Sequence, residues 1–498
     1  MSGGVPLWQR SATALAREIR EGGLRSRQVV DAHIARVQFV NPTLNAVVQD
    51  RFEAAREEAD RADAEWDRVQ RVGGVLPPLH GVPCTIKEAF SFAGMPNTSG
   101  LPARIGREVT KDGVTVARLR EAGAIPLGVT NTSELCMWME STNRVYGRTS
   151  SAYSPRHTSG GSSGGEGAII GAGGSPFGLG ADIGGSIRMP AFFNGVFGHK
   201  GTARRIPNTG QYPVSEGAAQ LLLCTGPLCR RAEDLMPLVR ILEGPDGVDP
   251  NCEVMPQHSP GDVSMEGVVV HTLVTRGGPR MSASLAEALE NSAEALVARG
   301  ATRREIRMDA LGKALPMWAA AMGDAAETSF GTLLGDGTEI GLFREWMRWW
   351  GGRSEHTFPA LGLVGLERLE AFIMRFGDLS DGMLQLAEET RVELDKTLGP
   401  TGVLLYPPHW TTAPRHNRSL WLPVRWAHTA LFNVLHSPVT QVPTGFDSEG
   451  LPTGVQVVGA QGSDHVTIAV ALALEDALGG WTPPSQFGED GAHPNGSR

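Results

Sequence analysis

Two serines set among glycines constrain this chain more than any other feature of its sequence. Ser162 lies in GGSSGG at 160–165, and Ser186 follows 24 residues later in DIGGSIRMP at 182–190. Eight glycines fall between positions 160 and 174, although glycine loses more backbone entropy on folding than any other residue. We therefore expect bare N–H groups and close backbone contacts here. Such an arrangement suits a serine that attacks a carbonyl while the backbone binds the oxyanion.

The composition narrows the class of protein. With 498 residues and 41% hydrophobic residues, the chain is long enough to bury a sizeable core. The net charge of −9 and the lack of long Lys/Arg clusters argue against a nucleic-acid partner. The five cysteines include no CxxC pair, which predicts neither a metal site nor a disulfide framework and favours a cytoplasmic location. Without an apolar run of about 18 residues, we expect no membrane span.

The first part of the chain is typical of helices. Residues 11–21 predict a short helix, and a second helix is predicted to start at a Ser26 cap and to end before Pro42. The charge-dense stretch 51–70 predicts a solvated surface helix.

From about residue 79 the pattern indicates an α/β sheet. Apolar runs bounded by Gly and Pro at 81–86 and 124–129 predict buried strands, with a helix at 114–122 between them. Residues 245–400 differ: they predict helices rich in Trp and Met, which form either core or an apolar substrate channel. Near the C-terminus the pattern returns, with strands predicted at 403–406, 439–442 and 454–458 and a helix at 464–478.

Lys87 is the third residue that carries chemistry. It follows an apolar run, so we expect it at the end of a buried strand. Burial disfavours a charged lysine, and a neutral lysine acts as a general base. Taken alone, a lysine after a strand is more often a surface residue.

Two other kinds of site fit the serines poorly. A phosphate-binding loop fits poorly because no Gly-Lys-Ser/Thr follows the glycines in this sequence. A histidine-based serine hydrolase also fits poorly. The sequence has thirteen histidines, but no serine lies in a recognisable Gly-x-Ser-x-Gly elbow.

Taken together, the motifs resemble those of the amidase signature family. Lys87 comes 75 residues before Ser162, and Ser186 comes 24 residues after it, each in the family's sequence context. Further matching segments are TNTSELCMW at 130–138, FFNGVFGHK at 192–200, LYP at 405–407 and GLPTGVQVV at 450–458. Within the family the chain is most similar to type-2 fatty acid amide hydrolase, from about residue 75 to Trp481.

The resemblance implies a role for each motif residue. Ser186 would be the nucleophile, Ser162, in an unusual cis peptide linkage, would relay the proton of Ser186, and Lys87 would be the base. Ser163 would hydrogen-bond the lysine. The resemblance further implies an oxyanion hole from the amides of Ile183, Gly184, Gly185 and Ser186, loop support from Asp182 and Arg188, and pocket residues Cys136, Met137 and Trp138.

The family also implies an architecture. We expect an α/β fold in a single large domain, with a mixed β-sheet core of about eleven strands surrounded by helices. This domain would span 1–483, with the motif core at 79–210, the helical segment at 245–400, the C-terminal sheet and helix at 401–483, and a flexible tail at 484–498. The sequence departs from the family at Gly201-Thr202, where proline is common, so we expect a different turn there.

The reaction implied is hydrolysis of a small-molecule amide through an acyl-enzyme, without metal or cofactor. The Trp- and Met-rich middle favours an apolar acyl or aryl group, and carbamate or ester hydrolysis at the same site stays open. A rival hypothesis is an amidotransferase subunit acting on charged tRNA, which shares these motifs but needs partner chains and a basic surface. A non-catalytic relative would be expected to lose one of Lys87, Ser162 and Ser186. A homodimer is possible.

Overall fold

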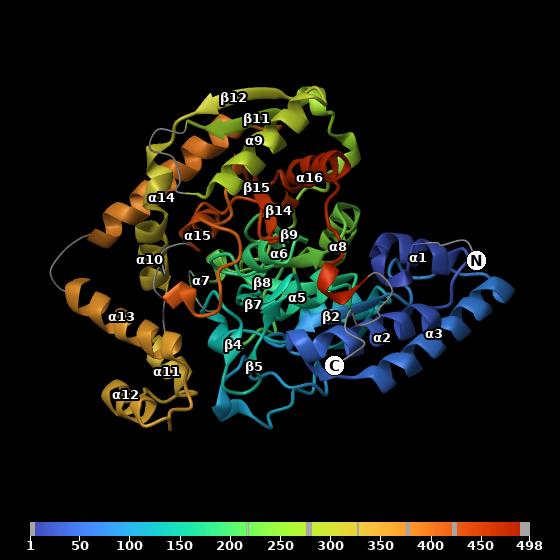
Figure 1. The fold of residues 1–498 in the computed structure, drawn as a ribbon, viewed down its shortest axis with the longest axis horizontal. Helices are drawn as coiled ribbons and strands as arrows, with labels where there is room; N and C mark the ends of the chain where they lie inside the picture. Colours follow the sequence, from blue (N-terminus) through green and yellow to red (C-terminus); the bar gives the residue numbers. More distant parts are fainter. Residues whose placement is uncertain are drawn as a thin grey trace.

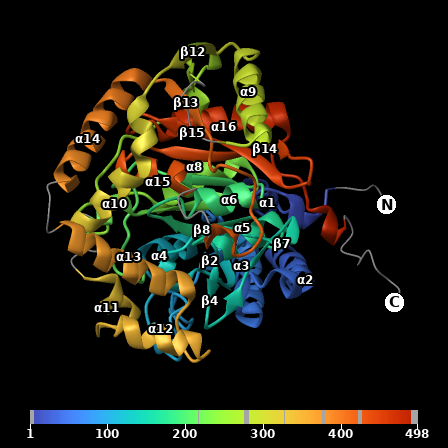
Figure 2. The same cartoon turned by 60° about the vertical axis from the view of Figure 1, so that its left-hand side comes forward.

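One mixed sheet of eleven strands is the centre of the molecule. The computed structural model describes residues 5–488 apart from 216, 218, 275–280, 326–327, 375–378 and 421–425. Helices surround the sheet (Figures 1 and 2). The predicted fold class is therefore confirmed, and so is the predicted size of the sheet.

The strands follow an order that brings distant segments together. From edge to edge the order is β1-β3-β2-β8-β10-β9-β14-β15-β13-β11-β12. β2 lies between β3 and β8 and is parallel to both, while β8 and β10 are antiparallel. The bounds are β1 Val47–Asp50, β2 Pro83–Lys87, β3 Ile125–Thr130, β8 Phe177–Asp182, β9 Phe197–Lys200, β10 Cys224–Cys229, β11 Val269–Leu273, β12 Thr302–Ile306, β13 Gly402–Tyr406, β14 Val439–Phe446 and β15 Pro452–Gly459.

The α-helices pack around this sheet, and two short hairpins lie beside it. Their bounds are α1 Ala12–Arg20, α2 Ser26–Leu44, α3 Phe52–Val72, α4 Val114–Glu121, α5 Gly164–Gly171, α6 Arg188–Phe193, α7 Ala219–Leu222, α8 Leu235–Leu242, α9 Ala283–Val297, α10 Ala314–Ala325, α11 Phe330–Leu334, α12 Leu342–Trp350, α13 Phe358–Met374, α14 Leu379–Leu398, α15 Ala427–Val434 and α16 Asp464–Leu478, with hairpin strands β4 Thr142–Asn143, β5 Gly147–Arg148, β6 Ser150–Ser151 and β7 Ser154–Thr158. In the described residues, none of these helices combines the length and apolarity needed to cross a membrane.

Most predicted elements occur where the sequence placed them, but α2 differs. The predicted end before Pro42 is wrong, because α2 continues through Pro42 to Leu44 and ends at Asn45, which has a left-handed backbone (φ 52°). Ser26 is the first helical residue and not the cap, since Arg25 and Gln28 form the capping box.

The middle segment 245–400 is not purely helical. It contributes β11 and β12, which pair in parallel at the edge of the sheet. Met317 of α10 is buried in the core, whereas Met347 and Trp350 of α12 are exposed. Helices α11, α12 and α13 project together from the body (Figure 1).

The two remaining expectations concern turns and the tail. After Lys200, the N–H of Thr202 donates to Asp464 Oδ1 (2.9 Å), and a Cβ on Gly201 would crowd the same carboxylate. Asp464 therefore determines this turn. At the C-terminus, Ser485–Phe487 forms a 3-10 helix in which Phe487 is buried against Phe39. The rest of the predicted flexible tail, residues 489–498, lies outside the described residues.

Candidate active site

Lys87 and Ser162 are in direct contact inside the protein. Lys87 is the last residue of β2, and its side chain is buried, as is that of Ser162. Its Nζ donates a hydrogen bond to Ser162 Oγ at 2.7 Å. The two residues are 75 positions apart in the chain, so the parallel pairing of β2 with β8 and the turn into α5 bring them together.

The backbone around Ser162 is unusual and tightly enclosed. The peptide bond between Gly161 and Ser162 is cis. Ser141 Oγ donates to the carbonyl of Ser162 (3.0 Å) and accepts from the N–H of Gly164 (2.9 Å). A Cβ on Gly161 would collide with the backbone of Trp138 and Met139. The close backbone contacts expected from the glycine-rich sequence are therefore present.

Among the described residues, Ser163 makes no hydrogen bond with the lysine. Its hydroxyl donates to the carbonyl of Ala181 (3.3 Å) and accepts from the N–H of the same residue (3.4 Å). Its own N–H donates to the carbonyl of Ser186 (3.2 Å). Ser163 therefore joins the segment of Ser162 to β8 and to the segment of Ser186, in place of the hydrogen bond to Lys87 that the resemblance implied.

The hydrogen bond from the N–H of Ser163 to the carbonyl of Ser186 (3.2 Å) holds the segment of Ser186 against that of Ser162, and Ser186 is the most accessible of the three residues. It is 9% exposed, against 1% each for Lys87 and Ser162. Among the described residues, its hydroxyl has no hydrogen-bond partner, and the carbonyl of Ser186 is held by Ser163. The hydroxyl is therefore free to meet a substrate.

A buried ion pair shapes the loop that carries Ser186. Both oxygens of Asp182 bind the Arg188 guanidinium, at 2.9 and 3.0 Å, and neither side chain is exposed. Although burial disfavours its charged form, the charge of Arg188 and its hydrogen bonds hold the pKa of Asp182 well below its usual range. Arg188 also donates to Gln456 (2.8 Å) and Asn433 (2.7 Å). The pair therefore anchors the loop to β15 and α15.

The loop offers three backbone donors and not four. The N–H of Gly185 donates to Asp182 Oδ1 at 2.7 Å, because the carboxylate caps the turn. In the part of the chain that the structure describes, the N–H groups of Ile183, Gly184 and Ser186 have no backbone or side-chain acceptor. The expected role of Gly185 as a donor is therefore corrected, while the other three remain available.

Two tryptophans that are distant in sequence border this loop. Trp318 of α10 donates its indole N–H to the carbonyl of Ile183 (2.9 Å). Its ring meets that of Trp426 edge to face, with centroids 4.6 Å apart. A Cβ on Gly184 would touch both rings. Trp318, from the middle segment, therefore contacts the loop that carries Ser186.

The predicted pocket residues diverge. Met137 packs on the cluster formed with α11 and α13, whereas Trp138 packs on the cluster around Met189 and Phe193. Cys136 is half-buried, and its thiol contacts Thr132 Oγ1 at 3.3 Å. The carbonyl of Trp138 lies against Gly161, so this segment covers the cis linkage.

Several residues of this neighbourhood were not predicted from the sequence. These residues can be far in sequence from their partners: Gln456 is 268 positions from Arg188. No periodicity or spacing in the sequence indicates their contacts. They are Ser141, Glu166, Trp426, Thr429, Asn433 and Gln456.

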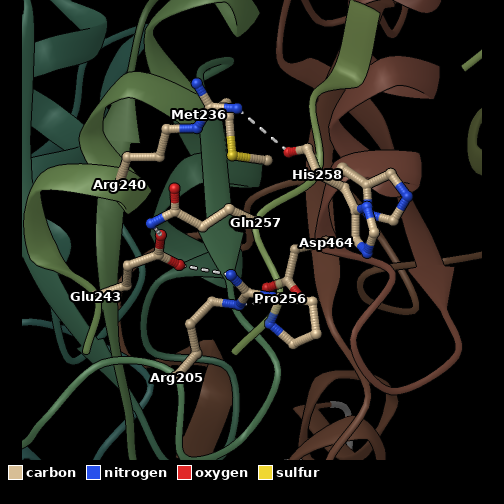
Figure 3. Close-up of a pocket in the computed structure, with 9 residues that line it drawn as sticks. Arg205, Met236, Arg240, Glu243, Pro256, Gln257, His258 and Asp464 are labelled. Atoms are coloured by element: carbon tan, nitrogen blue, oxygen red, sulfur yellow. Dashed lines mark hydrogen bonds and ion pairs between the residues drawn. The ribbon is translucent and has the colours of Figure 1, made fainter. Parts of the chain in front are cut away.

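A separate shallow pocket lies between α8 and the start of α16 (Figure 3). Its charged side chains largely pair with one another: Arg205 binds Glu243 (2.5 Å) and Asp464 (3.3 Å). Among its lining residues there is neither a serine nor a lysine. This pocket is therefore not the candidate site for carbonyl chemistry.

Comparison with known proteins finds a matching family and several similar proteins. Residues 28–468 match the Amidase family. The chain is 42% identical over 493 residues to fatty-acid amide hydrolase 2-B of Danio rerio, covering 96% of this chain and 91% of that protein. It is 30% identical over 483 residues to an acylamidase of Rhodococcus erythropolis (93% and 94%). Its fold resembles the solved structure of 6-aminohexanoate cyclic dimer hydrolase, with a TM-score of 0.80, 25% identity and coverage of 97% and 100%.

Proposed function

Because this chain belongs to the Amidase family and is an amide-hydrolysing enzyme, we propose that it cleaves amides through an acyl-enzyme on Ser186. The observation that carries the proposal is the buried 2.7 Å hydrogen bond from Lys87 Nζ to Ser162 Oγ, on a segment that Ser163 ties to the carbonyl of Ser186, whose hydroxyl makes no hydrogen bond within the described residues. A nucleophile needs a base within reach, directly or through one relay.

The proposed steps use these groups in order. Lys87, in its amine form, takes the proton of Ser162, and Ser162 takes the proton of Ser186 as Ser186 Oγ attacks the carbonyl carbon. The N–H groups of Ile183, Gly184 and Ser186 stabilise the oxyanion, an interaction that is stronger for the tetrahedral intermediate than for the flat amide. The protonated Lys87 then returns its proton through Ser162 to the leaving amine. A water molecule then attacks the acyl-enzyme, losing its proton through Ser162 to Lys87, and the acid leaves as Ser186 regains a proton.

The tryptophan pair supports an apolar substrate. Trp318 and Trp426 lie against the loop that would hold the oxyanion, so a group bonded to the carbonyl would meet aromatic surface. The similar fatty-acid amide hydrolase is named for fatty acyl amides, and the acylamidase for acyl amides. We propose that the substrate is an amide with an apolar acyl or aryl group.

A substrate panel tests the proposal. The protein, purified alone, is offered acetamide and, at matched size, a fatty acyl amide, an acyl p-nitroanilide and an aryl carbamate. We expect amide hydrolysis without any partner chain, with kcat/KM higher for the apolar amides than for acetamide, because apolar binding adds about 0.8 kcal/mol per buried methylene. Faster turnover of the carbamate would change the substrate class while leaving the chemistry intact. No hydrolysis of any substrate without added partner chains would favour the amidotransferase hypothesis.

A further inference from the structure

Glu166 is a buried carboxyl that the proposed steps do not use. It lies in the first turn of α5, four residues after Ser162, and is fully buried. No cation forms an ion pair with it among the described residues. Instead, Oε2 accepts from Thr85 Oγ1 (2.7 Å) and Oε1 accepts from Thr130 Oγ1 (2.8 Å).

These two threonines flank Lys87. Thr85 precedes Lys87 by two residues on β2, and side chains two apart on a strand lie on the same face. Thr130 is the register partner of Lys87 on β3. The carboxyl of Glu166 therefore joins α5 to β2 and β3. Lys87 ends β2, and α5 begins two residues after Ser162.

The opposing strand makes room for this carboxyl. A Cβ at Gly178 of β8 would overlap Glu166 Oε2 and touch Thr85 Oγ1. Two residues along, a Cβ at Gly180 would approach Ser163 Oγ. Because Gly178 and Gly180 have no side chains, the side chains of Glu166 and Ser163 can pack directly against β8.

The charges around Glu166 are few. Burial raises its pKa to about 8, while the hydrogen bonds from Thr85 and Thr130 and the charge of Lys87 act in the opposite direction. Cys84 of β2 is the other titratable neighbour, and burial together with Glu166 raises the pKa of its thiol. Lys87 is therefore the cation that the carboxylate acts on.

We propose that Glu166 is the positioning residue of Lys87. Through Thr85 and Thr130 it holds the lysine against Ser162, and its negative charge stabilises the ammonium that forms when Lys87 accepts the proton of Ser162. Glu166 neither gains nor loses a covalent bond in this step. The inference rests on the proposed function, since it assigns a partner to the proposed base.

The variant Glu166→Gln tests this role because it keeps the size of the side chain and removes its charge. In the wild type the carboxylate is present above its pKa of about 8 and lost below it, so kcat should rise as pH increases through 8. In Glu166→Gln we expect the contribution of Glu166 to this rise to be lost and kcat at pH 9 to fall by about 10–100-fold, with KM within about threefold. Below pH 7 the loss should be smaller, since wild-type Glu166 is then protonated.

Glu88→Gln is a matched control. Glu88 follows Lys87 and is equally buried, but its carboxylate binds the loop at Thr98 and Ser99 and the hydroxyl of Tyr146. We expect the rise near pH 8 to survive in this variant whatever its kcat. Glu166→Asp keeps the charge and should keep the rise at a reduced kcat. It also serves as the test variant if Glu166→Gln fails to fold.

Two results would overturn the inference. One is a Glu166→Gln profile with the same shape as the wild-type profile, since a merely structural residue lowers kcat equally at every pH. The other is an infrared difference spectrum at pH 9, which needs no turnover, in which the wild type shows no carboxylate signal that Glu166→Gln lacks. Failure of the proposed function looks different: the wild type would then turn over no amide, or a serine-reactive phosphonate would label a residue other than Ser186.

Discussion

Replacing Ser186 by alanine removes amide hydrolysis, and kcat falls by about 10⁴-fold or more while the protein stays folded. The hydroxyl makes no hydrogen bond within the described residues, so its loss leaves no buried partner unsatisfied. Loss of a nucleophile removes the covalent route entirely, and the remaining rate comes only from binding and the oxyanion donors. The measurement is single-turnover hydrolysis of an acyl anilide, with circular dichroism and thermal unfolding as checks on folding.

Ser175→Ala is the matched control for this loss. Ser175 is a buried serine near the other end of β8, and its hydroxyl donates to the carbonyl of Phe177 (2.6 Å). Activity of this variant should follow its folded fraction. Retained turnover in Ser186→Ala, with Ser175→Ala unchanged, would place the nucleophile elsewhere.

Replacing Lys87 by alanine lowers kcat for amides by about 10²–10⁴-fold, the usual contribution of a general acid–base group. The 2.7 Å contact between Nζ and Ser162 Oγ is the only path that the described side chains give for a proton leaving Ser162. The loss should be smaller for a p-nitrophenyl ester of the same acid, because a phenoxide leaves without receiving a proton. The ratio of amide to ester kcat in the two proteins measures this difference.

Lys200→Met controls for the removal of a buried lysine. Lys200 ends β9 and is fully buried, and its Nζ donates to the carbonyl of Gly201 (3.0 Å). This variant should lower amide and ester turnover by the same factor. If Lys87→Ala also lowered both equally, Lys87 would have no role in protonating the leaving group.

The sequence predicted the parts of the site that are local in the chain. Lys87 falls at the end of its strand, and Ser162 and Ser186 lie on glycine turns, because runs of apolar residues and glycines mark such places without help from distant segments. The helix at 464–478 was also predicted, since its periodicity and the following Gly479-Gly480 are local signals.

The parts that failed depend on tertiary contacts. The edge strand β12, Thr302–Ile306, is polar and mostly exposed, so no apolar alternation marks it. Pro42 stays in α2 because the helix buries its own Val37 and Val40 in an apolar cluster with residues of α5 such as Ile169. Asn433 and Gln456 meet Arg188 across more than 240 positions, and the bond from Gly185 to Asp182 exists only in the folded turn. None of these contacts leaves a pattern in one sequence.

The central claim is that Lys87, through Ser162, deprotonates the hydroxyl of Ser186. It is tested most directly by the rate at which a fluorophosphonate labels the protein, with the labelled peptide identified by mass spectrometry. The account predicts a single adduct on Ser186, formed quickly in the wild type and at least about 10²-fold more slowly in Lys87→Ala and Ser162→Ala. Labelling of another residue, or equal rates in all three proteins, would contradict it.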